Sequence, residues 1–427
     1  MPKGMRVMVI GDGGREHALV WKLAQSPLVG QIYAVPGNAG MAQEPKTTPY
    51  LVPPDHKSIV AAAKTQSIDL VVIGPEAPLA DGLADLLEDA GILVLGPRKL
   101  GAALEASKVS AKDFMTRHGI PTAPYAHFND LHAAEEYIRS CSFPVVIKAD
   151  GLSRGKGTEI AETPEAALLA VRKWLAQGRI VVEKFLDGEE ATYTRLVAGG
   201  AALPFPSSQD HKRLLDRDRG PMTGGMGAYS PAPVVDDAVE ERIYEGIIIP
   251  LLRGLEVEMI SYTGFLYIGL MIVDGRPYVL EFNCRLGDPE AQALLMRFDG
   301  DLATLFFQAA RGKLEQALLE WDPRPAVCVV LAAAGYPNES RKRDVIWGLE
   351  HVGTLEDVKV FHAGTEYSSG KVVTTGGRVL GVTAKGDSVG QARETAYQVV
   401  KKIRFPGMQY RSDIGHRAVA REVAASD

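Results

Sequence analysis

The sequence predicts an α/β and α+β protein of about three domains, the first of which is a doubly wound parallel sheet. Short apolar strands alternate with helical stretches over roughly the first hundred residues, an order typical of parallel sheets with helices on both faces. The first strand is apolar without alternation, as expected for a strand covered on both sides. A length of 427 residues suggests about three domains of roughly 100–200 residues each.

Four strands and several helices are predicted in the N-terminal part. The first strand, at 5–10, leads through a glycine turn into a helix at 15–25. Further strands are predicted at 31–35, 68–73 and 92–95, and glycines follow their ends. Ligands of open parallel sheets bind at the carboxyl ends of the strands, so we expect a ligand site at these turns.

The rest of the chain mixes helices and strands. Periodicity and turn signals predict helices at 107–119, 163–176, 302–311 and 388–403, and strands at 144–148, 180–183, 263–273, 277–282 and 327–331. The sequence Asp274-Gly275-Arg276 predicts a hairpin between two of these strands. Residues 207–233 are polar, glycine-rich and without clear period, which predicts a long loop that is a lid, a binding loop or disordered.

Composition excludes several functions. A net charge of −6 argues against nucleic acid as a partner, because a phosphate backbone requires a basic surface. Three cysteines far apart predict no disulfide framework and a reducing compartment. The sequence contains neither a signal-peptide pattern nor an apolar run of about 20 residues. We therefore expect a cytoplasmic protein that binds neither nucleic acid nor membrane.

The first glycine turn, at 11–14, opens a helix, where backbone N–H groups and the helix dipole favour an anion. A dinucleotide fingerprint requires a third glycine where this chain has Glu16, and the second strand lacks the acid that would hold a ribose. A phosphorylated small molecule contacted by Arg15 therefore fits better than NAD. A tight packing turn is the alternative.

A second glycine-rich segment, at 148–158, carries several cations. It is not a Walker A loop, because only three residues separate its first two glycines and Gly157 follows Lys156. Its glycines, with Lys148, Arg154 and Lys156, suit a polyphosphate. A solvated hairpin tip is the alternative, but Lys148 ends an apolar strand, where a charge without an anion is costly.

The strand at 180–183 leads to residues that suit a nucleoside. Glu183 ends the strand, and either this carboxylate or that of Glu190 suits ribose hydroxyls. The neighbouring Phe185 and Leu186 suit an adenine ring. On these residues alone, exposed surface charges are the simpler explanation.

The segment Glu281-Phe282-Asn283 is typical of a divalent metal site. Strand alternation places Glu281 and Asn283 on one face. A carboxylate and an amide oxygen suit Mg²⁺, whose other ligands are usually water and substrate phosphates. Arg285 continues the same face. An ordinary polar strand end is the alternative, which the density of charge after an apolar strand disfavours.

Taken together, these motifs resemble the glycinamide ribonucleotide synthetase family of the ATP-grasp superfamily over almost the whole chain. The motifs that carry the resemblance lie at 11–18, 74–79, 209–213, 223–231, 281–290 and 410–415. The resemblance implies an N-terminal domain at 1–104, a central ATP-grasp domain at 105–325 with a mobile flap subdomain at about 121–190, and a small C-terminal α+β domain at 326–427.

The resemblance also implies a reaction. ATP phosphorylates the carboxylate of glycine, and the amine of 5-phosphoribosylamine then displaces phosphate, giving glycinamide ribonucleotide in de novo purine biosynthesis. Mg²⁺ or Mn²⁺ is the implied metal, ATP is the co-substrate, and a monomer or homodimer is expected. Phosphoryl transfer relies on positioning and charge neutralisation, so a Ser/His/Asp or Cys/His set is not required.

Site roles follow from each residue's place in the matching motifs. Catalytic roles fall on Lys148, Arg285 and Asp210, with Asp210 also taking the ammonium of glycine, and metal ligation falls on Glu281 and Asn283. The implied nucleotide site comprises Lys108, Lys148, Gly151, Gly155, Lys156, Gly157, Glu183, Lys184, Phe185, Leu186 and Glu190. The implied substrate site comprises Gly11, Gly13, Gly14, Arg15, Glu16, His17, Pro75, Glu76, Asp210, Lys212, Arg213, Gly224, Gly225, Arg285, Asp288 and Pro289.

The chain departs from the family's usual pattern at six positions, none of them a predicted ligand. These are Ser153, Arg154, Thr158, Met222, Cys284 and Leu286, and those in the flap put its kinetics in doubt. Three other functions stay open from the sequence: a different ATP-grasp carboxylate–amine ligase, a dinucleotide-dependent oxidoreductase, and a non-catalytic nucleotide sensor.

Overall fold

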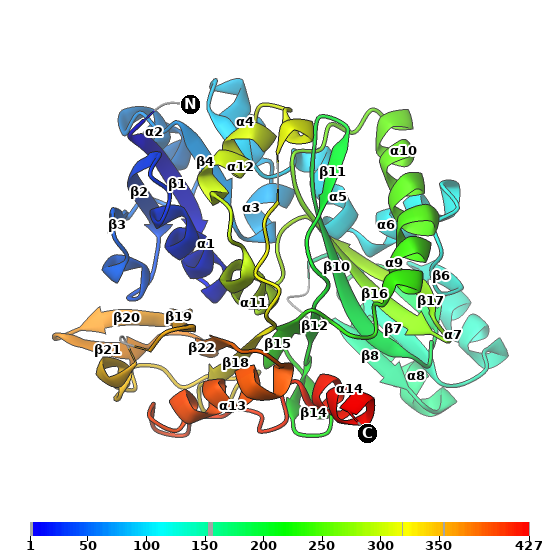
Figure 1. Cartoon of the computed structure of the whole chain (residues 1–427). Coiled ribbons are helices and arrows are strands. Elements are labelled where there is room, and N and C mark those ends of the chain that lie inside the picture. The colour runs from blue at the N-terminus through cyan, green and yellow to red at the C-terminus, as the bar shows by residue number, and fades with distance from the viewer. Residues whose placement is uncertain (1–2, 153–156, 318, 353–354, 427) are drawn as a thin grey trace.

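A computed structural model describes residues 3–152, 157–317, 319–352 and 355–426. The N-terminal part is a five-stranded parallel sheet in the order β3-β2-β1-β4-β5 (Figure 1). Its strands are β1 (Met5–Gly11), β2 (Val29–Pro36), β3 (Thr47–Pro49), β4 (Leu70–Ile73) and β5 (Leu93–Leu95). The accompanying helices are α1 (Gly14–Ala24), α2 (His56–Thr65), α3 (Glu76–Ala80), α4 (Leu83–Asp89) and α5 (Lys99–Ala106).

Both faces of this sheet are covered, which confirms the predicted doubly wound fold. Val7 and Val9 pack in one core with α1, whereas Met8 and Ile10 pack in another with α2 and α4. Successive side chains of β1 thus enter opposite cores, as the strand period of two requires. Within this N-terminal sheet, only β3 has no counterpart among the predicted strands.

Two antiparallel sheets form the central part. One has the order β6-β9-β7-β8, and α7 and α8 pack on it. Its elements are β6 (Tyr125–Phe128), α7 (Leu131–Ser140), β7 (Val145–Ala149), β8 (Thr158–Ala161), α8 (Pro164–Leu175) and β9 (Ile180–Lys184). The other has the order β11-β10-β16-β17, with β10 (Glu189–Ala198), β11 (Ala201–Pro204), β16 (Gly264–Val273) and β17 (Arg276–Asn283).

Helices pack around the second sheet and connect the parts of the molecule. They are α6 (Lys108–Arg117), α9 (Asp237–Ile243), α10 (Ile249–Val257), α11 (Glu290–Arg297) and α12 (Leu302–Ala309). The predicted hairpin joins β16 to β17, and both Asp274 and Gly275 have the positive φ that a tight two-residue turn requires. No helix within the described ranges is long and apolar enough to cross a membrane.

The C-terminal sheet is built from two distant segments. Its order is β12-β15-β18-β22-β19, with β12 (Gln209–Asp210), β15 (Gly227–Ser230), β18 (Ala326–Ala332), β19 (Val358–His362) and β22 (Arg378–Lys385). Two hairpins accompany it, β13 (Arg213–Leu215) with β14 (Arg219–Met222) and β20 (Thr365–Ser368) with β21 (Lys371–Thr374). The helices α13 (Val389–Val400) and α14 (His416–Ser426) complete this part (Figure 1).

The prediction of one irregular loop at 207–233 is wrong. The segment contains β12 to β15, and Tyr229 of β15 is fully buried beside β18. Strands of two to four residues are too short to show a period, and the glycines between them concealed the buried positions.

Candidate active site

The end of β17 carries the predicted metal ligands. Glu281 Oε1 lies 4.0 Å from Lys212 Nζ, and Asn283 Oδ1 accepts a hydrogen bond from Arg285 Nη2 at 3.2 Å. Burial opposes ionisation of Glu281, but Lys212, Lys148, Lys108 and Arg285 lower the pKa of its carboxyl to about 2. The group is thus an ionised acceptor at neutral pH.

These two oxygens fit a hard cation. Asn283 is buried, while the Glu281 side chain is 38% exposed and accessible to a ligand. No cluster of three or more His, Cys, Asp or Glu side chains in the described ranges could hold a metal ion. A Mg²⁺ site with few protein ligands completes its shell with water and phosphate oxygens, so this donor set suits a metal that arrives with a nucleotide.

A buried group of three charges lies beside that strand end. Glu183 pairs with Lys148 at 3.0 Å and with Lys112 at 3.1 Å. Lys148 Nζ also donates to the carbonyl of Leu280 at 3.1 Å, which ties β7 to β17. Burial lowers the pKa of Lys112 to about 8, against the attraction of Glu183.

Lys112 was not among the predicted site residues. It donates to Thr122 Oγ1 at 2.6 Å, and that hydroxyl donates to the carbonyl of Val279 at 2.6 Å. Its signal in the sequence was its spacing, because Lys112 lies three residues from both Val109 and Met115 on the buried stripe of α6.

The residues near β9 that are predicted to bind a nucleotide differ in burial and in contacts. The carboxylate of Glu183 faces the two lysines, whereas Lys184 is exposed and Phe185, Leu186 and Glu190 are half-buried. Lys108 Nζ donates to the carbonyl of Gly151 at 2.9 Å. Gly157 is buried, and Gly155 and Lys156 lie outside the described residues.

A small cavity lies between β10, β12 and β16. Its polar lining includes Glu190, Asp210 and Lys212, and Glu190 Oε2 lies 3.0 Å from Lys212 Nζ. Asp210 Oδ1 is buried without a hydrogen-bond partner among the described residues. Burial and the neighbouring Glu290 raise the pKa of Asp210. A cationic ligand group beside Asp210 would restore its charge.

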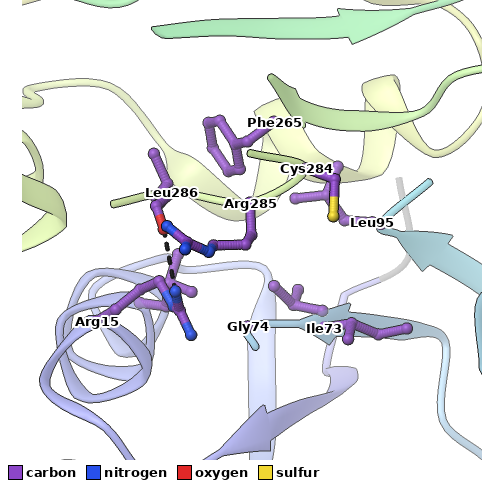
Figure 2. A pocket seen from close by; sticks show the side chains of 11 residues that line it. Arg15, Ile73, Gly74, Leu95, Phe265, Cys284, Arg285 and Leu286 are labelled. Atoms are coloured by element: carbon purple, nitrogen blue, oxygen red, sulfur yellow. Dashed lines mark hydrogen bonds between the residues drawn. The ribbon is translucent and has the colours of Figure 1, made fainter. Parts of the chain in front are cut away.

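A second small cavity lies where the N-terminal sheet meets the end of β17. Figure 2 shows Arg15 and Arg285 converging on it, with Gly74 at the end of β4. Arg15 Nη1 donates to the carbonyl of Leu286 at 3.1 Å. Two fixed cations with glycine backbone at a strand end suit an anion such as a phosphate.

Arg285 is held by two carboxylates. Its Nη2 lies 2.9 Å from Glu105 Oε1 and its Nε lies 3.3 Å from Glu76 Oε2. Glu105 also accepts from the backbone N–H and the thiol of Cys284, at 2.7 and 3.0 Å. Burial raises the pKa of Glu105 although Arg285 opposes that effect. Glu105 was missed because its partners lie about 180 residues away in sequence.

The first glycine turn packs around Glu16. The Glu16 carboxylate accepts from the N–H of Gly13 at 2.8 Å and from Arg15 Nε at 2.5 Å. A Cβ at Gly74 would collide with the Glu16 side chain. The first glycine turn is therefore tightly packed, which was the alternative to an anion site in the sequence analysis. Arg15 nevertheless lines the cavity near the end of β17.

His17 faces away from both cavities. Its Nδ1 accepts from the N–H of His362 at 2.7 Å, so its Nε2–H donates to Glu44 at 3.0 Å. Lys359 also bonds to Glu44, at 2.5 Å. Burial lowers the pKa of His17 and keeps the ring neutral. His17 therefore joins α1 to β19, and its role in substrate binding stays a prediction.

The remaining predicted substrate residues separate into two groups. Arg378 of β22 donates to the carbonyls of Gly224 and Asp288, and its Nη2 lies 3.3 Å from Asp288 Oδ2. A Cβ at Gly225 would lie 2.6 Å from Pro289 and 2.7 Å from Asp210, so these residues are in close contact. Arg213 instead bonds within its own hairpin, to the carbonyl of Gly220 at 2.9 Å. Arg378 was missed because it comes from the C-terminal sheet.

Buried lysines contact both antiparallel sheets, and a carboxylate and an amide lie at the end of β17. This arrangement suits the phosphates and the metal of a nucleotide. Family models of phosphoribosylglycinamide synthetase match the N domain at residues 5–105, the ATP-grasp (A) domain at 106–291 and the C domain at 326–417. The chain belongs to the phosphoribosylglycinamide synthetase family, which confirms the resemblance seen in the sequence.

Relatives and solved structures agree with this membership. The phosphoribosylamine–glycine ligases of Vibrio vulnificus (strain YJ016) and Yersinia pestis are each 50% identical to it, covering 98% of this chain and 99% and 100% of theirs. The crystal structure of the Thermotoga maritima phosphoribosylamine–glycine ligase has a TM-score of 0.82 at 36% identity, covering 96% of this chain and 100% of that one. A biotin carboxylase domain from Hydrogenobacter thermophilus shares the fold, with a TM-score of 0.74 at 16% identity and coverage of 96% and 92%.

Proposed function

We propose that this chain is an ATP-dependent ligase that joins glycine to 5-phosphoribosylamine, giving glycinamide ribonucleotide, ADP and phosphate in purine biosynthesis. One observation carries the proposal beyond family membership. The end of β17 separates an anion cavity with Arg15 and Arg285 from a charged site with Glu281, Lys148 and Lys212. A sugar phosphate and an activated carboxylate can therefore meet at one strand end.

The chain's residues would serve three tasks. Lys108 and Lys148, with the segment 151–157, would neutralise the phosphates of ATP, since phosphoryl transfer depends on charge neutralisation and positioning. Glu281 and Asn283 would hold Mg²⁺ or Mn²⁺, which when bound neutralises charge on the transferring phosphoryl group. Asp210 would take the ammonium of glycine, leaving the carboxylate free to become glycyl phosphate.

Burial between the two cavities would protect such an acyl phosphate from water. Arg15 and Arg285 would hold the phosphate of phosphoribosylamine, so that its amine approaches from the cavity side. We also propose a cytoplasmic location, a monomer or homodimer, and small molecules as the only partners.

Isotope transfer tests both the substrates and the intermediate. Glycine labelled with ¹⁸O in its carboxylate is expected to pass one ¹⁸O to inorganic phosphate, because the bridging oxygen leaves with phosphate. ADP release should require glycine and phosphoribosylamine together. Turnover with another acid and amine, but not with these, would indicate a different carboxylate–amine ligase, and unlabelled phosphate would contradict glycyl phosphate.

Arg15→Ala is expected to raise the apparent KM for phosphoribosylamine about tenfold or more, with the KM for ATP changed less than about threefold. The physical reason is the loss of one charge-assisted contact to a phosphate. Steady-state kinetics with each substrate varied in turn would measure it. An unchanged KM for phosphoribosylamine would place the phosphate elsewhere.

His17→Ala, two residues further on, is expected to lower stability while leaving the KM for phosphoribosylamine nearly unchanged. Unfolding in urea should show a loss of about 2 kcal/mol, because the buried N–H of His362 loses its partner and Glu44 keeps only Lys359. The KM for phosphoribosylamine should stay within about threefold. His127→Ala is the control, since His127 is exposed. A large KM effect without loss of stability would restore His17 to the substrate site.

A further inference from the structure

The motif at 410–415 takes no part in the chemistry above, yet its arginine, Arg411, is fully buried. Arg411 Nη1 donates to Asp218 Oδ1 at 2.7 Å and to the carbonyl of Arg213 at 3.2 Å. Its Nε and Nη2 donate to the two carboxylate oxygens of Asp413 at 2.7 and 2.9 Å. A planar guanidinium fixes such partners in direction as well as distance.

Further contacts connect the same two segments. The N–H of Arg217 donates to Asp413 at 2.7 Å, and the N–H of Ser412 donates to Asp216 at 2.8 Å. Arg417 of α14 binds the second oxygen of Asp218 at 2.6 Å. The tip of the β13–β14 hairpin is therefore attached to the C-terminal segment through backbone and side chains.

The base of the hairpin is attached as well. The N–H of Gly415 donates to His211 Nε2 at 3.0 Å, while Arg411 reaches the carbonyl of Arg213. Lys212 lies between His211 and Arg213 in the sequence. Its carbonyl accepts hydrogen bonds from the N–H and the hydroxyl of Thr223, both at 2.8 Å. The backbone on either side of Lys212 is thus fixed, and its ammonium reaches Glu190 in the cavity with Asp210.

We infer that residues 411–417 form a clamp that positions Asp210 and Lys212 in the active site, with Arg411 and Asp218 as positioning residues that touch no substrate. Six of the hydrogen bonds described above connect residues 411–417 to residues 211–218. The inference rests on the proposed function only in naming the substrate that the clamp serves, which is glycine.

The test uses Asp218→Asn and Arg411→Lys in the full-length protein, with Arg341→Lys as the control. Asp218 has a φ of 52°, a conformation that asparagine tolerates, so its turn should persist. Arg341 forms a similar two-bond pair with Asp344 in the C-terminal part, away from the hairpin. Hydrogen exchange followed by mass spectrometry reports on the hairpin without any substrate, and kinetics report on the site.

Both clamp variants are expected to exchange the amides of 213–223 at least tenfold faster, with β18 unchanged. The KM for glycine should rise about tenfold and the KM for ATP less than threefold, whereas Arg341→Lys should alter neither exchange nor kinetics. Hairpin exchange within twofold of wild type, or equal kinetic losses in the control, would overturn the clamp. A wild-type protein that forms no ADP with glycine and phosphoribosylamine would refute the proposed function alone, because the exchange measurement is independent of turnover.

Discussion

Glu281→Ala is expected to lower kcat by about a thousandfold while leaving the fold intact. The carboxylate is the one charged protein ligand proposed for the metal, and four cations hold its pKa at about 2. Without it, Lys212, Lys148, Lys108 and Arg285 lose their shared counter-charge, and the metal keeps only the amide of Asn283. Removing one preorganised electrostatic contact commonly costs 10²–10³-fold in rate, and loss of a metal ligand should reach the upper end.

Two variants sharpen this experiment. Glu281→Gln keeps the shape and removes the charge, so a similar loss of kcat would attribute the effect to charge. Glu258→Gln removes a carboxylate that pairs with Arg117 and His118 outside the site, and its kcat should stay within about twofold. Circular dichroism should match wild type in all three. Near-normal turnover of Glu281→Ala would refute the metal assignment.

Arg285→Met is expected to reduce both stability and activity. The substitution leaves Glu105 and Glu76 facing each other across the space of the lost guanidinium. Breaking a buried ion pair by removing one partner costs about 3 kcal/mol or more, which urea unfolding would measure. The anion cavity also loses one of its two arginines, so kcat/KM for phosphoribosylamine should fall at least about a hundredfold.

The pH dependence of that stability loss has a definite sign. Burial already raises the pKa of Glu105, and removal of Arg285 raises it further. A group whose folded pKa exceeds its unfolded value stabilises the fold when protonated and loses that contribution as pH rises through the folded pKa. The variant should therefore be less destabilised at pH 5 than at pH 8.

Arg98→Met is the matched control for this prediction. Arg98 pairs with Glu88 and Asp89 at the surface, with its side chain 41% exposed. Exposed pairs contribute about 1 kcal/mol or less, so its loss should be small at both pH values. A loss of stability in Arg285→Met that is no larger than this control would contradict the buried carboxylate pair.

Much of the fold could be predicted because local pattern and tertiary structure agree. Uniformly apolar strands predicted the buried parallel sheet, and Asp274-Gly275 predicted the turn between β16 and β17. The strands β12 and β15 could not be predicted, because neither has a local period. β15 is a strand because it pairs with β18 some hundred residues later, and β12 is a strand because it pairs with β15.

The site residues also divide into those that local pattern predicts and those that depend on distant partners. Strand alternation predicted that Glu281 and Asn283 would share a face, since two residues along one strand fix their relation. Lys112, Glu105 and Arg378 reach the site through partners on other elements, and spacing along the chain carries no information about such meetings. Arg15 lines the cavity, whereas His17, two residues along α1, contacts β19.

The composite C-terminal sheet bears on how members of this family can exchange parts. A crossover between two relatives at residue 326 would join β18 of one parent to β15 of the other, in the middle of a sheet. The heritable module is therefore discontinuous, because residues 207–233 belong structurally with the segment that begins almost a hundred residues later. Chimaeras that transfer both segments together would preserve the pairing of β15 with β18. Chimaeras that take the two segments from different parents would pair strands whose sequences did not evolve together.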